Sequence, residues 1–220
     1  MFKFSRLVVL GVSAIALHQS GAQSKTQQKP AGIFAGVELS PFLISTDKYI
    51  SDTSARTSAA MGVGAQVGLR SRSGIGPFVR LEGAFAPRQS GSYRVLNFNY
   101  GLRWSVVPLQ GALHGRIPYV EVAVNNRIIS QNNVKVEGRT YSNGSEEAPF
   151  PKVSSGGIAM LVGAGLEFHV REKALLNMGI SRTKGRFNSI RFGGSPVDGW
   201  DFDGTDYRLH VGIQWLRGAP

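Results

Sequence analysis

The chain contains no cysteine, and it has no apolar run long enough to span a bilayer as a helix. The first absence excludes thiol catalysis, disulfide bonds and cysteine metal sites. The second excludes a helical membrane anchor, because the apolar run from Leu7 to Leu17 has eleven residues where about 20 are needed. There is also no helical amphipathic stretch long enough to build a second domain, so one domain is expected.

Acidic residues are scarce: 14 Asp and Glu oppose 25 Lys and Arg, for a net charge of +11. Nucleic acid is the first partner to consider. However, the chain has no Lys/Arg-rich block and no nucleic-acid motif, and its basic residues alternate with apolar ones. We therefore expect anionic lipid headgroups or lipopolysaccharide phosphates, for which arginine is a good bidentate partner.

The first segment predicts a secretory signal peptide over residues 1–22. Lys3 and Arg6 precede the apolar run, and Ser20, Gly21 and Ala22 offer small residues for cleavage before Gln23. The alternative, an anchor that stays attached, requires a longer apolar run. Residues 23–31 form a short polar lead-in.

The last strand indicates the solvent that the protein faces. Residues 207–215 place Tyr207, Leu209, Val211, Ile213 and Trp215 on one side and polar or small residues on the other. Large apolar groups on one face, aromatic at both ends, are typical of a strand between lipid and a polar interior. Other strands must pair with it, because an open sheet edge cannot face hydrocarbon.

Period-two alternation recurs in eight stretches of roughly the length that a tilted membrane strand needs. They lie near residues 32–42, 59–70, 76–86, 93–105, 117–128, 157–170, 174–184 and 205–216. Their connections alternate between short and mostly long, which is typical of turns on one side of a membrane and loops on the other. The longest, 129–156, is expected to extend its flanking strands; an additional hairpin near 134–141 is the alternative.

Alternation alone cannot say which face points outward, because a lipocalin-like barrel has the same pattern turned inside out. Glycine and alanine at the polar positions of residues 59–70 and 157–170 fit a crowded interior, and none of the eight lysines is mid-strand. Aromatic residues at matched depths also predict two membrane girdles. The girdle residues are Phe85, Trp104, Phe168, Tyr207 and Trp215.

With the apolar face outward, charges of both signs fill the interior. The predicted network consists of Glu38, Arg70, Arg80, Glu82, Arg103, Glu121, Arg127, Glu167 and Arg208, with His169 and His210 also inward. Eight strands leave an interior just wide enough for side chains, so these pairs should plug the lumen. The alternative is a gate whose pairs rearrange to pass ions or water.

Other chemistry finds less support. No serine lies near a histidine in a recognisable catalytic motif, so we expect no enzymatic activity. We expect no cofactor either. Residues 201–204 bear a faint similarity to a calcium loop without its full spacing or terminal glutamate, so a solvated acidic loop is expected. At headgroup height, lipopolysaccharide contacts are predicted for Arg182, Lys184, Arg186 and Arg191.

The signal peptide, the eight Gly-rich alternating stretches, the loop asymmetry and the closing strand resemble the small outer-membrane β-barrel superfamily, of the OmpA transmembrane-domain, OmpX and opacity-protein type. The resemblance implies an all-β, eight-stranded antiparallel up-and-down transmembrane barrel over residues 32–216, with a tail at 217–220, in the bacterial outer membrane. Residues 207–215 resemble a recognition signal for the barrel-assembly machinery. The expected function is non-enzymatic presentation of loops, in envelope structure or adhesion. A narrow porin-like channel and a secreted lipocalin-like carrier are the alternatives.

Overall fold

The computed structural model describes residues 32–46, 57–88, 91–106, 116–134, 141–142, 147–148, 150–171, 173–197 and 201–218. The predicted signal peptide and polar lead-in lie outside these residues. Within them, no helix is long and apolar enough to cross a bilayer.

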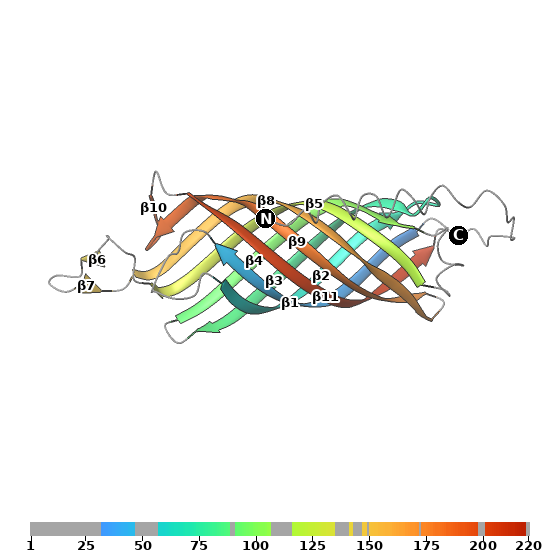
Figure 1. Ribbon diagram of the computed structural model, residues 1–220, viewed down its shortest axis with the longest axis horizontal. Coiled ribbons are helices and arrows are strands. Elements are labelled where there is room, and N and C mark those ends of the chain that lie inside the picture. Colours follow the sequence, from blue (N-terminus) through green and yellow to red (C-terminus); the bar gives the residue numbers. More distant parts are fainter. Residues whose placement is uncertain are drawn as a thin grey trace, which may run out of the picture.

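Eight long strands form one closed antiparallel barrel, which confirms the predicted fold class (Figure 1). They are β1 (Gly32–Thr46), β2 (Thr57–Arg70), β3 (Ile75–Arg88), β4 (Gly91–Ser105), β5 (Arg116–Val134), β8 (Phe150–Arg171), β9 (Ala174–Phe192) and β11 (Phe202–Gly218). Each strand pairs with its neighbour in the chain, and β11 closes the barrel by pairing with β1 from Gly32↔Gly218 to Thr46↔Gly204. The closing strand therefore continues two residues past the predicted end of the barrel.

Both flanking strands extend into the connection predicted at 129–156, as the first of the two alternatives required, whereas residues 135–140 of the alternative hairpin lie outside the described residues. β5 continues to Val134 and β8 begins at Phe150, and the two pair up to Val134↔Phe150. A separate two-residue pairing joins β6 (Tyr141–Ser142) to β7 (Glu147–Ala148), outside the barrel sheet. A third short strand, β10 (Ser195–Val197), folds back on β9 through a turn at Gly193 and Gly194, where φ is 59° and 97°.

The turn between β2 and β3 also depends on glycine. Gly74 has φ of 86°, a conformation that other L residues rarely adopt, and its amide donates to the Ser71 carbonyl at 3.0 Å. This turn lies at the same end of the barrel as the predicted short connection after β8. The long connections lie at the opposite end, which we call the outer end.

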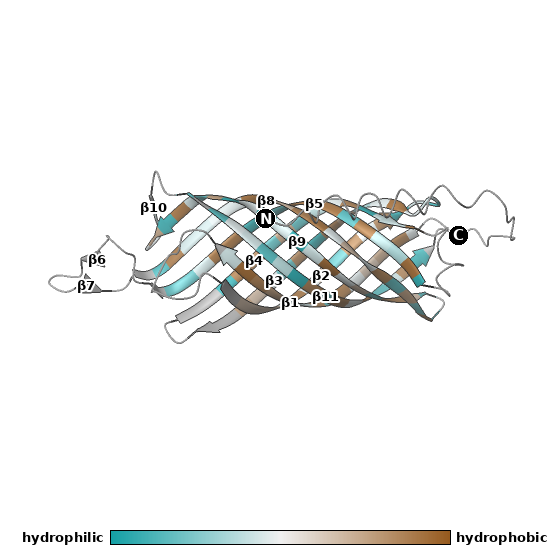
Figure 2. Ribbon diagram, viewed as in Figure 1, coloured by the Kyte–Doolittle hydropathy of each residue, from teal (hydrophilic) through white to brown (hydrophobic). Residues whose placement is uncertain are grey.

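Side chains alternate strictly between the lumen and the outer surface along most strands. The outward positions are apolar over the middle of the barrel, and the strands in Figure 2 accordingly alternate between brown and paler or teal segments. On β1, for example, Ile33, Val37, Leu39 and Leu43 are each about half exposed, at 51–56%. A belt of large exposed apolar side chains around a closed barrel is what a bilayer accommodates, and water does not. The lipocalin-like alternative is therefore wrong, because that barrel would turn these side chains inward.

Candidate functional site

Glu121 of β5 lies at the centre of the lumen and accepts hydrogen bonds from two arginines. Arg80 donates to it at 2.9 and 3.1 Å, and Arg103, its register partner on β4, at 2.7 Å. Arg80 also pairs with Glu38 of β1 at 3.0 Å, and both arginines reach the Gln66 side-chain oxygen. These side chains join five consecutive strands, β1 to β5, and all are at least 95% buried.

Toward the end with short turns, Arg70 of β2 pairs with Glu167 of β8. Its Nη2 donates to both carboxylate oxygens, at 2.6 and 2.7 Å. Toward the outer end, Arg208 donates to Glu82 at 2.5 Å and to Asp206 at 2.9 Å. Charge-assisted bonds of this geometry are the strong ones, and here nearly every charged group has a partner of opposite sign.

Asp206 is the charged member that the sequence pattern did not assign to the network. It has the same parity on β11 as the inward Arg208 and His210, although it lies beside the acidic stretch 201–204. In the structure it is fully buried and pairs with both Arg127 and Arg208. Parity alone would have found it, because the predicted strand 205–216 already contains Asp206, and the structure extends that strand back to Phe202.

The structure places all nine residues of the predicted network in the lumen, and each takes part in an ion pair. His210 is also inward, with its Nε2 2.7 Å from the Tyr119 hydroxyl of β5. His169 corrects the prediction: it is exposed, because the β8–β9 register shifts between His169 and Arg171 and ends the alternation there.

An apolar layer covers the charge network on its outer side. Ten buried residues contributed by seven strands form it: Phe42, Ile44, Ala60, Ala84, Val95, Ile129, Val153, Phe187, Ile190 and Phe192. Phe42 lies under the Arg208 guanidinium at 5.4 Å and Phe187 near that of Arg127 at 6.0 Å, so the two layers are in contact. The alternation of charged residues does not predict this apolar layer.

The predicted girdle residues all point outward. Phe85, Trp104, Tyr207 and Trp215 are 36–54% exposed. Phe168 is half-buried, with the Arg116 guanidinium 5.9 Å from its ring.

The four predicted headgroup residues are likewise exposed on β9, but they differ in their neighbours. Arg186 forms an ion pair with Asp201, and its register partner on β11 is Asp203. Arg182 instead lies over the Tyr207 ring, at 5.6 Å. The acidic loop residues Asp201 and Asp206 are thus directed at arginines, and no group of three metal-binding side chains occurs among the described residues.

No known family model matches the chain, and no curated protein is significantly similar to it in sequence. Its fold, however, matches solved structures. Neisserial surface protein A superposes with a TM-score of 0.59 over 85% of this chain and 99% of that one, at 12% identity. The outer membrane protein AlkL superposes with a TM-score of 0.50 over 90% and 95%, at 13% identity.

This chain has the fold of the small outer-membrane β-barrels. The apolar belt and the closed ring of antiparallel strands suit a membrane, because a closed barrel leaves no backbone group unpaired in hydrocarbon. At 12–13% identity the likeness shows the fold alone and says nothing of the chemistry of individual residues.

Proposed function

We propose that this outer-membrane barrel is a non-enzymatic, sealed scaffold that presents its outer loops at the cell surface, in envelope structure or adhesion. The observation that carries the proposal is the double seal of the lumen. A solute would have to part a network of buried ion pairs and then cross a packed apolar layer. Each barrier opposes ions for a different reason. Passage through the network would leave buried charges without their ion-pair partners, and passage through the apolar layer would strip the ion of its hydration.

Two further observations support a role for the outer surface rather than for the lumen. The strands β5, β8 and β9, of 19, 22 and 19 residues, exceed the roughly 10 residues that span a membrane, so they extend outside it. The buried histidine, His210, is directed at Tyr119 and not at a serine or a pocket that opens to solvent. Neisserial surface protein A, as its name says, is itself a surface protein.

The test is single-channel recording in planar bilayers with the refolded, heat-modifiable protein. We expect no unitary current from the wild type, and none from Arg80→Ala or Glu82→Ala, because the apolar layer remains in each. Well-defined channel openings in the wild type that either substitution alters would contradict the scaffold proposal. They would favour a narrow ion channel gated by the charge pairs. If the wild-type protein is not bound to membranes, or does not change its gel mobility on heating, the outer-membrane setting itself is contradicted.

A further inference from the structure

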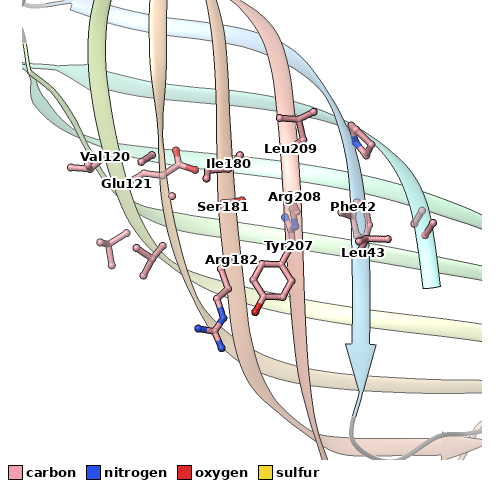
Figure 3. A pocket seen from close by; sticks show the side chains of 17 residues that line it. Phe42, Leu43, Val120, Glu121, Ile180, Ser181, Arg182, Tyr207, Arg208 and Leu209 are labelled. Carbon is pink, nitrogen blue, oxygen red and sulfur yellow. The ribbon is translucent and has the colours of Figure 1, made fainter. Parts of the chain in front are cut away.

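An oblique groove crosses the lipid-facing surface over β2, β1, β11, β9, β8 and β5 (Figure 3). Its volume is about 740 Å³, within the range of roughly 300–1,000 Å³ that is usual for ligand sites. Inward residues such as Glu121 and Ser181 also line it, but they are at most 5% exposed, so its accessible surface comes from outward residues such as Ile180, which is 66% exposed. The feature is therefore on the outside of the barrel.

Two rows of outward side chains form the walls of the groove. One row runs through consecutive register partners: Ala59, Leu43, Tyr207, Arg182, Val162 and Val122. The other runs, two residues away on each strand, through Leu209, Ile180, Ala164 and Val120. At about 3.4 Å per residue the rows are roughly 7 Å apart, which suits one extended hydrocarbon chain.

The groove runs obliquely across the bilayer. Rows of register partners lie perpendicular to the strands, and membrane strands tilt by roughly 35–45°. Leu43 and Ala59 lie near the outer ends of β1 and β2, whereas Val120 lies four residues from the start of β5 at the opposite end. A chain lying in the groove would therefore descend from the outer leaflet into the hydrocarbon core.

Positive charge lies in the wall of the groove, at Arg182, and continues outward on β9. Arg182 lies over Tyr207, and the register partners of Arg182 and of Lys184 are Val162, Tyr207, Met160 and Thr205. None of these carries a negative charge. Arg186, by contrast, is neutralised by Asp201. Among the residues that the structure describes, no carboxylate is a register partner of Arg182 or Lys184. Two such neighbouring cations above an apolar groove are complementary to a phosphate that carries acyl chains.

We propose that this groove is a specific site for lipid A of lipopolysaccharide, with a phosphate on Arg182 and Lys184 and one acyl chain along Ile180, Ala164 and Val120. The proposal rests on the proposed function, because only an outer-membrane barrel meets this lipid in its outer leaflet. It adds a defined lipid contact to a protein whose lumen is sealed.

The test is native mass spectrometry of the refolded full chain in detergent with lipid A added. We expect the wild type to retain one lipid A. R182Q loses one charge-assisted contact with the phosphate, and A164F fills the space of the acyl chain. Each variant should therefore bind lipid A roughly tenfold more weakly. The matched controls are R94Q and A65F. Arg94 is an outward arginine on β4, the register partner of Phe85 on β3, and Ala65 is an outward alanine on β2 away from the groove. Both should bind as the wild type does.

Two results would overturn the lipid site. One is equal retention of lipid A by R182Q, A164F and the wild type, and the other is displacement by an equal concentration of phosphatidylglycerol. Heat-modifiable migration of every variant, checked in the same samples, shows that the barrel is folded. If lipid A is not retained by a folded barrel, the groove proposal fails while the sealed scaffold stands.

Discussion

Arg70 of β2 and Glu167 of β8 form a two-pronged ion pair, at 2.6 and 2.7 Å, between strands that are four positions apart in a ring of eight. The pair therefore spans the full width of the lumen. Arg208 and Glu82 likewise join β11 to β3 across two intervening strands. Pairs of this kind cannot form within a hairpin, so the network exists only when the barrel is closed.

Replacing Glu167 by glutamine should destabilise the barrel by about 3–5 kcal/mol, because Arg70 would stay buried without its carboxylate. Equilibrium unfolding in urea from lipid vesicles, followed by tryptophan fluorescence, measures the change. The double variant Arg70→Met with Glu167→Leu removes both charges and should be closer to wild type than E167Q. If the double variant is the less stable one, the ion pair is worth more than its desolvation cost.

Asp206 and Asp201 offer a comparison between a buried and an exposed aspartate on one segment. Asp206→Asn leaves Arg127 and Arg208 in the lumen with one acid fewer, and the expected loss is again several kcal/mol, on the order of 3. Asp201→Asn breaks a pair in which the Arg186 side chain is 66% exposed, so the change should be below about 1 kcal/mol. Equal losses in the same unfolding assay would show that burial does not set the strength of these pairs.

Gly179 faces the Tyr119–His210 hydrogen bond from β9. A Cβ at this position would lie 2.3 Å from the tyrosine hydroxyl and 2.6 Å from the histidine Nε2, which cannot both be accommodated. Gly179→Ala should therefore cost about 1–3 kcal/mol. Gly83→Ala is the control: nothing lies within 4 Å of its Cβ, so stability should be unchanged or slightly raised. A neutral Gly179→Ala in thermal unfolding would mean that Tyr119 and His210 can move apart.

Trp215 and Trp104 separate membrane anchoring from assembly. Both are exposed aromatics near the ends of strands on the side with short turns, but only Trp215 is in the closing strand, within residues 207–215. Alanine at either site should weaken spontaneous insertion into vesicles to a similar degree, since each removes one interfacial aromatic. In cells, Trp215→Ala should lower the heat-modifiable fraction further. Equal effects of the two substitutions in cells would contradict the expected contact between residues 207–215 and the barrel-assembly machinery.

The fold was predictable because membrane strands obey a simple rule. Their period is two, and the residue classes on the two faces differ sharply, so Tyr207 and Arg208 alone define the faces of β11. The strand ends were harder: β5 and β8 run past the predicted 128 and 157 because outside the membrane their outward residues become polar, which blurs the alternation. His169 fails for a related reason, a register shift that no side-chain pattern announces.

For the site, parity predicted which charges share the lumen but not which of them pair. Arg80 could have paired with any inward acid; its actual partners, Glu38 and Glu121, depend on the stagger of the strands around the barrel. The groove was invisible for the same reason. Ala164, Ile180 and Leu209 become neighbours only through the register of β8, β9 and β11.

The strands of this barrel have unequal lengths, and its outer mouth is therefore slanted. β8 has 22 residues and β2 has 14, so the wall made by β5, β8 and β9 stands taller than the side made by β1 and β2, with the β6–β7 segment beyond it (Figure 1). The β6–β7 pairing therefore lies farther from the belt of exposed apolar side chains than the ends of β1 and β2 do. An approaching molecule would touch this segment first, whereas the shorter side stays recessed near the membrane plane.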